Sequence, residues 1–233
     1  MGAQLGRLRD GLVDFLFPVH CLACGSEGSY ICRSCRRTLP RLLPPVCLKC
    51  GRPLIRDDRC SVCARWKLEI DGIRSVFVFQ GLVRRAVHQF KYNNLRALAF
   101  PLADLVAGDL KARPLPVDVV VAVPLHRRRL RGRGYNQSAL LARELSQMVG
   151  LPLVEGSLVR VKDSPAQVKA AGADERRENV RGAFSCRDGQ MSGRHVLLID
   201  DVCTTGATLD ACAMALKAAG ASSVWGLTLA REA

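Results

Sequence analysis

Two adjacent acids near the carboxyl end of the chain follow directly on a run of four apolar residues. The segment reads Val-Leu-Leu-Ile-Asp-Asp from 196 to 201. An apolar run of this length predicts a strand that is buried on both faces. Asp200 and Asp201 therefore stand at the exit of a strand, where their carboxylates can accept hydrogen bonds from paired hydroxyl groups such as a sugar diol.

Small residues and threonines continue this segment and lead into a predicted helix at 207–219. The first backbone N–H groups of a helix attract anions, and threonine hydroxyls can add to such a cradle. A glycine in the turn lets the backbone approach a phosphate closely. The residues expected to line this anion site are Cys203, Thr204, Thr205, Gly206, Ala207 and Thr208. The whole segment predicts a site for a phosphate beside a diol, with Mg²⁺ as a further component.

A strongly cationic segment follows a second apolar run and reads Pro-Leu-His-Arg-Arg-Arg-Leu-Arg-Gly-Arg-Gly-Tyr-Asn-Gln from 124 to 137. Arginine suits phosphate because its planar guanidinium pairs with two phosphate oxygens at once. Such a loop could bind a small phosphate ligand or contact a nucleic-acid backbone, and different arginines could also serve each of the two roles. The residues expected to contact the small ligand are Pro124, Leu125, His126 and Arg133. Those expected to contact nucleic acid are Arg127, Arg128, Arg129 and Arg131.

Eight of the eleven cysteines form four C-x-x-C pairs within residues 21–63. The tight turn between two such thiolates lets both face one tetrahedral ion, and four sulfur ligands close a structural zinc site. Eight thiolates are enough for two zinc ions. The simplest allocation is sequential, and a crossed one stays open because the segments between the pairs are short. The two sequential sets are Cys21, Cys24, Cys32 and Cys35, and then Cys47, Cys50, Cys60 and Cys63.

The rest of the chain alternates predicted strands and helices. Strands are predicted at 75–79, 117–123, 196–199 and 224–229, and helices at 82–90, 97–110, 136–148 and 207–219. Strands separated by helices predict an α/β fold with a parallel, doubly wound sheet. Ligands of such sheets bind at the carboxyl ends of the strands. Both polar segments lie at such ends, so we expect them to meet in one site.

Composition and spacing divide the chain into three parts. Residues 1–19 predict an amphipathic helix, residues 20–65 hold the cysteine pairs, and residues 66–233 form the α/β domain. The net charge of +14, from 35 Lys and Arg against 21 Asp and Glu, favours polyanionic partners. No apolar run predicts a transmembrane segment or a signal peptide. We therefore expect a cytoplasmic protein whose paired cysteines bind metal, with the inner face of the membrane as an open alternative.

Aromatic residues make up only 5% of the chain, which bears on any contact with single-stranded nucleic acid. Proteins that bind single strands without sequence preference usually stack bases on exposed rings. The few candidates are Trp66, Tyr92 and Tyr135. Nucleic-acid binding would therefore be mostly electrostatic and steeply dependent on salt. Lys91 could reach a ligand, but a lone lysine of this kind is interpreted as a surface residue.

Several motifs in a fixed order resemble the ComF family. They are the four cysteine pairs, Phe90-Lys91-Tyr92, Arg133-Gly-Tyr-Asn-Gln137, a long polar segment at 160–184 and the run at 196–208. The last of these is similar at every position to the phosphoribosyl-pyrophosphate signature of type I phosphoribosyltransferases. The resemblance extends from about His20 to Leu229. One departure is Tyr135, where phenylalanine is frequent in the family.

The resemblance implies a type I phosphoribosyltransferase-like sheet with helices on both faces, preceded by a double zinc ribbon. By the family pattern, Asp200 and Asp201 would be the catalytic pair and hold the ribose hydroxyls of phosphoribosyl pyrophosphate. The turn from Thr204 to Thr208 would hold its 5-phosphate, with Mg²⁺ bound alongside. The segment at 160–184 resembles the hood that closes over substrate in such enzymes. The implied cofactors are two structural zinc ions and magnesium.

The implied role is aid to the uptake of single-stranded DNA in natural transformation. A ComFA-type helicase and a recombination mediator are the implied partners. Two alternatives stay open. The chain could be an active phosphoribosyltransferase of unknown acceptor in nucleotide metabolism, since such chemistry depends mainly on positioning and electrostatics. It could also be a structural module for partner docking with a vestigial pocket, although its acids and threonines are intact.

Overall fold

The computed structural model describes residues 18–54, 60–163 and 173–232. The amphipathic helix predicted at residues 1–19 lies almost wholly outside the described residues, which begin at residue 18. The same holds for residues 164–172 of the polar segment that resembles a hood. Within the described ranges, no helix is long and apolar enough to cross a membrane.

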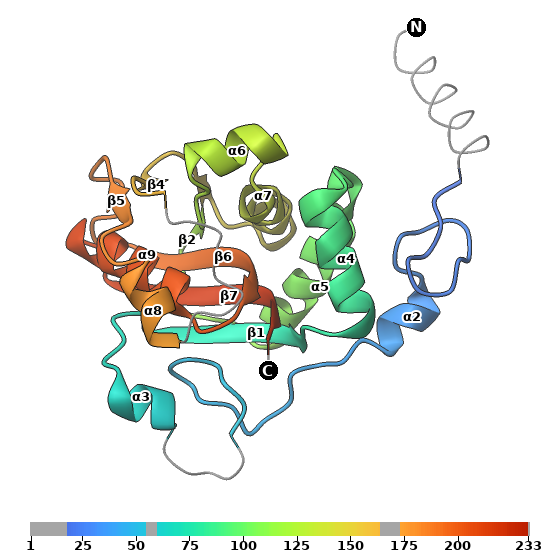
Figure 1. Cartoon of the computed structure of the whole chain (residues 1–233), viewed down its shortest axis with the longest axis horizontal. Helices are drawn as coiled ribbons and strands as arrows, with labels where there is room; N and C mark the ends of the chain where they lie inside the picture. Colours follow the sequence, from blue (N-terminus) through green and yellow to red (C-terminus); the bar gives the residue numbers. More distant parts are fainter. Residues whose placement is uncertain (1–17, 55–59, 164–172, 233) are drawn as a thin grey trace, which may run out of the picture.

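A five-stranded sheet forms the centre of the α/β domain, and every pair of neighbouring strands in it is parallel, as predicted. Its strand order is β1-β7-β6-β2-β3 (Figure 1). The strands are β1 (Gly72–Val78), β2 (Val119–Ala122), β3 (Leu153–Val154), β6 (His195–Cys203) and β7 (Ser223–Arg231). The two-residue strand β3 was not predicted, because it is too short to give a pattern of its own.

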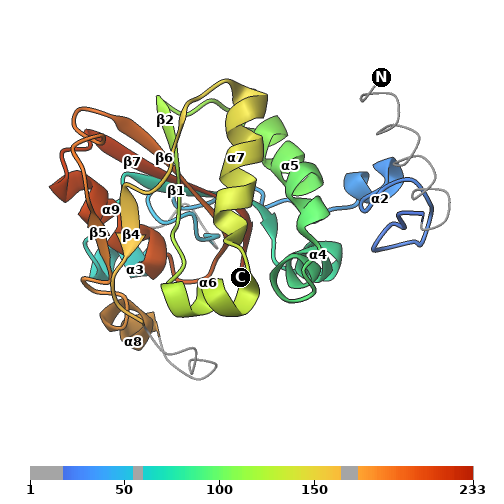
Figure 2. The ribbon, with the colours of Figure 1, turned by 90° about the horizontal axis from the view of Figure 1, so that it is seen from above.

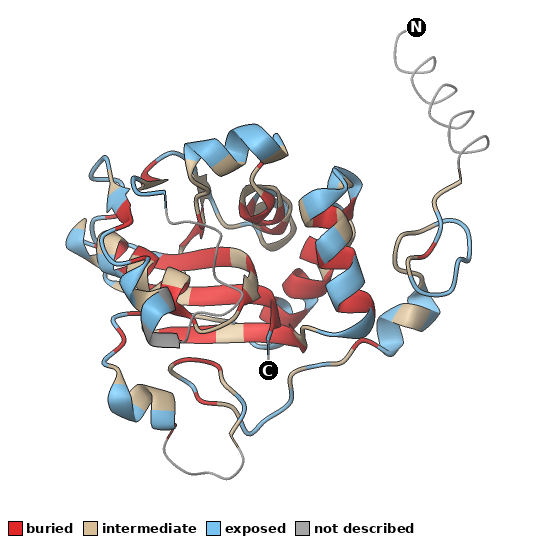
Figure 3. Ribbon diagram, viewed as in Figure 1, coloured by how far each residue is buried: buried red, intermediate tan, exposed pale blue. Residues whose placement is uncertain are grey.

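Helices cover both faces of this sheet (Figure 2). One face carries α4 (Gly81–Tyr92), α5 (Ala99–Ala112) and α7 (Gln137–Val149), and the other carries α9 (Ala207–Ala218). A short 3₁₀ turn, Arg96–Leu98, precedes α5. Each helix buries the apolar residues that recur at helical spacing, so two core clusters form, one on each side of the strands. Figure 3 shows this as buried strands between helices that are exposed on their outer sides.

The order of the strands reverses between β2 and β6. The chain leaves β2 through α7 to reach β3 on one side, and it leaves β6 through α9 to reach β7 on the other. In open parallel sheets, ligands bind outside the carboxyl ends of the strands at such a switch point. The segments that follow β2 and β6 are the two polar segments singled out in the sequence.

The cationic segment after β2 is largely helical, which corrects the predicted loop. Residues Arg127–Arg133 form helix α6. His126 is its N-cap, and Gly134 ends it in a left-handed conformation with φ of +79°. The prediction failed because the run of charges has no apolar periodicity, whereas arginine itself favours helices.

An antiparallel pair of strands lies over α9, formed by β4 (Leu158–Arg160) and β5 (Phe184–Cys186). The helix α8 (Ala173–Glu178) also contacts α9. The sequence predicted one long polar loop for this region. Short, irregularly patterned strands on a two-stranded sheet give too few alternating positions to be predicted.

The cysteine-rich part packs against the domain at two separate places. Helix α2 (Arg33–Arg37) lies beside α4 and α5, whereas α3 (Ser61–Arg65) lies below β1 (Figure 1). Arg36 on α2 forms an ion pair with Asp104 on α5, and Leu39 joins the core. Between the two places, the chain runs antiparallel along β1, with Leu42 N–H bonded to the Val76 carbonyl and Val78 N–H bonded to the Pro40 carbonyl. This connecting segment at 40–42 therefore covers the outer edge of β1.

Candidate functional site

The two acids of β6 are held from three different elements. The carboxylate of Asp200 accepts hydrogen bonds from the Ser138 hydroxyl at 2.7 Å and from the Asp201 N–H at 2.9 Å. Asp201 is buried, and its Oδ1 accepts the N–H of Val202 at 2.7 Å. Its Oδ2 lies 2.8 Å from Nζ of Lys91. The acids lie within β6 and not after it, because β6 continues its pairing with β7 as far as Cys203.

The charge of the site near neutral pH depends on the pKa values of Asp200 and Lys91. Burial and the neighbouring charge of Asp201 raise the pKa of Asp200 to about 7, against the opposing effects of Lys91 and Ser138. Burial by itself would lower the pKa of Lys91, but attraction to Asp201 and Asp200 outweighs it, and the pKa is raised. The site thus holds one ammonium–carboxylate pair and a second carboxyl group that changes charge near pH 7.

The raised pKa of Asp200 predicts a penalty for the folded protein at alkaline pH. Since the folded pKa of about 7 exceeds the ordinary value, stability is lost as the pH rises from about 4 to about 7, and the loss is complete above that range. We expect the substitution Asp200→Asn to raise the free energy of unfolding by about 1–2 kcal/mol at pH 8. At pH 4 the gain should vanish. Urea unfolding of the wild type and of Asp200→Asn at the two pH values measures this gain in stability. An equal gain at both pH values would contradict the raised pKa of Asp200.

The turn after β6 contains a glycine in the left-handed region and leads directly into α9. Gly206 has a φ of +83°, and a methyl group placed on it would lie 2.9 Å from Cδ1 of Ile73. Glycine is therefore favoured by the backbone conformation, and a methyl group here would also have to displace the end of the Ile73 side chain. The hydroxyl of Thr205 accepts the N–H of Ala207 at 3.3 Å and so caps the start of α9. The threonines of this segment are partly exposed, whereas Gly206 and Ala207 are buried.

The side chain of Cys203, a predicted ligand contact, is directed into the domain. The side chain is 2% exposed, and its sulfur lies 3.0 Å from Nη1 of Arg231. It is therefore packed inside the domain, and only the backbone of Cys203 remains available to a ligand at the turn.

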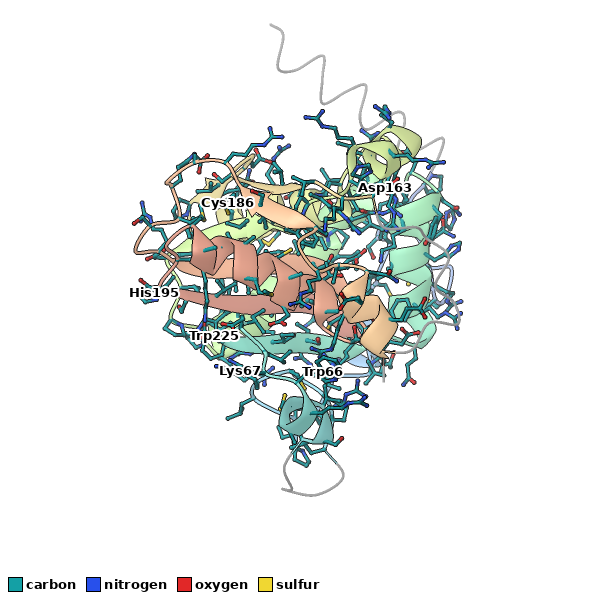
Figure 4. The ribbon with its side chains drawn as sticks, turned by 60° about the vertical axis from the view of Figure 1, so that its left-hand side comes forward. Trp66, Lys67, Asp163, Cys186, His195 and Trp225 are labelled. Atoms are coloured by element: carbon teal, nitrogen blue, oxygen red, sulfur yellow. The ribbon has the colours of Figure 1, made fainter. Side chains whose placement is uncertain are left out.

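Helix α6 presents its arginines at the end of the sheet where the acids lie. Arg127, Arg128 and Arg131 are exposed, and Arg129 is partly buried. Pro124, Leu125 and His126 connect β2 to this helix and are all partly buried. Nδ1 of His126 lies 3.2 Å from Oδ1 of Asp163, a residue that Figure 4 places next to the helix. The segment at 160–184, which resembles a hood, is thus joined to α6 by the contact between Asp163, near its start, and His126.

A cavity of about 500 Å³ lies between α6 and the end of α4. Its lining among the described residues consists of Lys91, Tyr92, Asn94, Arg129, Gly132, Arg133 and Tyr135, none of which is acidic. Lys91 connects this cavity to the acid pair through its contact with Asp201. Arg133 stands over the ring of Tyr92, 5.4 Å from its centroid. The cavity therefore has the charge of an anion site and adjoins the carboxylates.

The three aromatic candidates differ in their surroundings. Tyr135 is buried and donates its hydroxyl to the Phe90 carbonyl, which corrects its proposed role as a stacking surface. Trp66 is partly buried and has the guanidinium of Arg177 5.0 Å above its ring, in the region below α8 shown in Figure 4. Tyr92 is 66% exposed. Among the three, Tyr92 is the most exposed, although Arg133 and His88 lie against its ring.

The eight paired cysteines form two groups of four, and the grouping is the sequential one. Within each group the sulfur atoms all lie within 4.8 Å of one another. Three of the separations are 3.7 Å for Cys24–Cys32, 3.7 Å for Cys47–Cys63 and 3.5 Å for Cys50–Cys60. Tetrahedral zinc with bonds of about 2.3 Å requires sulfur separations of about 3.8 Å. Both groups therefore fit structural zinc.

The thiols of each group differ in how readily they ionise: despite burial, hydrogen bonds from the backbone lower the pKa of Cys21 to about 6 and that of Cys60 to about 7, whereas other thiols of the two groups have raised pKa values. Contacts with the neighbouring thiols of Cys32 and Cys24 raise the pKa of Cys35 to about 12. In the second group, burial and the nearby Cys50 thiol raise the pKa of Cys63. Four thiolates at such distances need a cation between them to be charged together.

Three residues that hold the site were not predicted to do so. Lys91 was interpreted as a surface residue, but it pairs with Asp201. Ser138 binds Asp200, and Asn136 donates its amide to the Val123 carbonyl at 2.9 Å while it caps α7. The sequence signal for Asn136 was its place at the start of the predicted helix at 136–148, where an N-cap is expected. The contacts of Lys91 and Ser138 join elements that are far apart in the sequence.

Comparison with known proteins agrees with this architecture. A family described as "Double zinc ribbon domain" matches residues 12–64, and one described as "Phosphoribosyl transferase domain" matches residues 135–232. Competence protein F of Haemophilus influenzae is 30% identical over 228 residues, which cover 92% of this chain and 98% of that protein. Competence protein ComFC of Bacillus subtilis is 30% identical over 236 residues, which cover 91% and 95%. DNA utilization protein YhgH of Salmonella typhi is 32% identical over 201 residues, which cover 83% and 87%.

The strand order, the cysteine groups and the two matched families define a double zinc ribbon joined to a phosphoribosyltransferase-like domain. The chain is similar to the two competence proteins above over nearly their full length. The chain belongs to the ComF family.

Proposed function

We propose that this chain binds magnesium phosphoribosyl pyrophosphate at the carboxyl ends of β2 and β6. The observation that carries the proposal is the pair Asp200 and Asp201, held next to a glycine turn that opens into α9. The pair lies at the switch point of the sheet, where ligands of this fold class bind. The two acids complement the diol of a phosphorylated ribose, and the turn with the start of α9 complements its phosphate.

Each part of the ligand would meet a different part of the site. The carboxylates of Asp200 and Asp201 would accept hydrogen bonds from the ribose hydroxyls. The backbone N–H groups at the start of α9, with Thr204 and Thr208, would hold the 5-phosphate. The cavity that Lys91 and Arg133 line would receive the pyrophosphate, because the lining that the structure describes is cationic and contains no acid. Mg²⁺ would neutralise part of the phosphate charge.

Calorimetric titration of the zinc-loaded protein tests this proposal. Phosphoribosyl pyrophosphate should bind saturably with Mg²⁺ and at least tenfold more weakly without it. Ribose 5-phosphate and inorganic pyrophosphate can each make only part of the proposed contacts. Both should therefore bind more weakly than phosphoribosyl pyrophosphate. Absence of binding with the zinc-loaded protein would overturn the proposal.

We propose further that α6 binds the backbone of single-stranded DNA, in a role in DNA uptake. Three arginines on this helix are exposed, and the net charge of the chain is +14. The relatives are named as competence and DNA utilization proteins, which fits a polyanionic partner of this kind. Tyr92 would offer a ring for base stacking beside the arginines.

The substitutions Arg127→Gln and Arg131→Gln together should weaken binding of a single-stranded oligonucleotide about fivefold at low salt. The logarithm of the binding constant should also fall less steeply with that of salt, by about 1.4 for two lost phosphate contacts. Fluorescence anisotropy at several salt concentrations measures both. The control is Arg33→Gln with Arg37→Gln, which removes two exposed arginines from α2. Equal effects of the two variants would show that only net charge matters and would count against α6.

A further inference from the structure

Arg231, at the end of β7, is a charged side chain enclosed in the domain. It is 1% exposed and is among the largest fully buried side chains. Its Nη1 donates to the backbone carbonyl of Cys50 at 2.8 Å and lies 3.0 Å from the sulfur of Cys203. Cys50 belongs to the second group of cysteines, and Cys203 opens the turn after β6. One guanidinium therefore contacts both the second zinc group and the proposed phosphate turn.

The charge of Arg231 calls for a nearby anion. Within the described part of the chain, no carboxylate forms an ion pair with it, and its Nη2 has no hydrogen-bond partner. A buried charge that lacks a counter-charge is costly. Four thiolates around Zn²⁺ sum to a charge of −2, so the second group, when loaded, supplies an anion next to the guanidinium. The buried arginine thus fits the zinc-loaded form of this group.

Two more contacts join the second group to the same turn. The N–H of Ile73 in β1 donates at 3.0 Å to the carbonyl of Lys49, which lies between Cys47 and Cys50. The Ile73 side chain packs directly beneath Gly206. Farther along, Oδ1 of Asp210 in the first turn of α9 accepts the N–H groups of Glu69 and Ile70 at 2.8 and 3.0 Å. The segment that leaves the second group is thereby attached to the helix that follows the turn.

The first group of cysteines has a different neighbour. Its helix α2 is bonded to α5 through Arg36 and Asp104, and Cys35 packs in the core cluster on the α4–α5 face of the sheet. The second group belongs to the cluster that also contains Cys203, Ala207 and Leu209. The two groups therefore differ in what they support, although their ligands are the same.

We propose that Arg231 couples zinc in the second group to the shape of the turn at 203–208. The arginine is a positioning residue: zinc fixes the Cys50 knuckle, the knuckle fixes the guanidinium, and the guanidinium fixes Cys203. Loss of that zinc loosens the turn, whereas loss of zinc from the first group leaves it in place. If the turn binds a phosphate, which rests on the proposed function, the coupling is reciprocal. Ligand binding then strengthens zinc binding at the second group by the same factor by which zinc strengthens ligand binding.

The alkylation rate of Cys203 tests the coupling without any ligand. The variants Cys35→Ser and Cys63→Ser each remove the last thiol of one group, and both thiols are partly buried. We expect iodoacetamide to modify Cys203 at least tenfold faster in Cys63→Ser than in the wild type, as followed by peptide mass spectrometry, and at the wild-type rate in Cys35→Ser. Cys212, fully buried in α9, reports opening of the whole domain and should stay protected. An unchanged rate at Cys203 in Cys63→Ser, or equal acceleration at Cys203 and Cys212, would overturn the proposal.

A variant of the arginine tests the same link from the zinc side. Arg231→Lys keeps the charge but cannot make both contacts. We expect it to release one of the two zinc ions at least fivefold faster to a chromophoric chelator. The matched control is Arg74→Lys on β1, whose guanidinium instead faces Asp109 and the Arg113 carbonyl. Release at the wild-type rate from Arg231→Lys would contradict the coupling. Both readouts are independent of phosphoribosyl pyrophosphate, so a failure of the proposed function is distinguishable from a failure of the coupling.

Discussion

The double variant Asp200→Asn/Asp201→Asn should bind magnesium phosphoribosyl pyrophosphate at least 100-fold more weakly than the wild type. Asparagine keeps the shape of each side chain but removes both negative charges. Hydrogen bonds to a charged group contribute roughly 1.5–3 kcal/mol each, so the loss of two corresponds to a factor of about 100 or more. Lys91 would also lose its partner and add an unpaired positive charge near the ribose.

The fold of this variant should survive, because Asp200 is held at an energetic cost that asparagine relieves. Calorimetry measures the affinity, and circular dichroism with zinc analysis checks the fold. A matched control, Asp104→Asn with Glu155→Gln, removes two surface acids that pair with Arg36 and Arg143. It should bind like the wild type. Affinity within threefold of the wild type in the Asp200→Asn/Asp201→Asn variant would mean that these acids do not hold the ligand.

Gly206→Ala should damage both stability and binding. An alanine with φ near +83° is strained by about 1–2 kcal/mol, and its methyl group would press on Ile73. We expect the free energy of unfolding to fall by about 2 kcal/mol. If the turn relieves the strain by changing φ, its N–H groups no longer converge. Affinity for magnesium phosphoribosyl pyrophosphate should then fall at least 30-fold.

A second glycine separates strain from function. Gly193 has a φ of +72°, and a methyl group added there would meet no atom within 4 Å, so Gly193→Ala suffers the backbone strain alone. It should lose about 1 kcal/mol of stability and none of its affinity for the ligand. Urea unfolding and calorimetry compare the two variants. Equal affinity in Gly206→Ala and the wild type would show that the turn does not hold the phosphate.

The central strands and helices of the domain were predictable because apolar residues there follow simple periods. The run at 117–123 and the run before Asp200 are the strands β2 and β6, and the helical spacing from Leu82 to Phe90 is α4. The cysteine groups were predictable for a different reason, since thiols close in sequence are also close in space. Local chemistry was sufficient in both cases.

Contacts between distant elements could not be predicted from local patterns. Lys91 and Asp201 are 110 positions apart, and nothing near either one indicates the other. No sequence pattern singles out Arg231, yet it is fully buried between a cysteine knuckle and the turn. The helix α6 was missed because solvated arginines leave no apolar stripe. The contacts of such residues depend on which distant elements pack together in the fold, and a single sequence does not show this packing.

The connecting segment at 40–42 has a consequence for how this protein behaves at high concentration. An uncovered edge strand offers free N–H and C=O groups to the edge of another molecule, and this starts aggregation. Here the segment occupies the edge of β1, and the prolines at positions 40, 44 and 45 leave few N–H groups to recruit a further strand. The opposite edge, β3, is only two residues long. By covering the edge of β1, the cysteine-rich part thus hinders edge-to-edge pairing between the sheets of two copies of this protein.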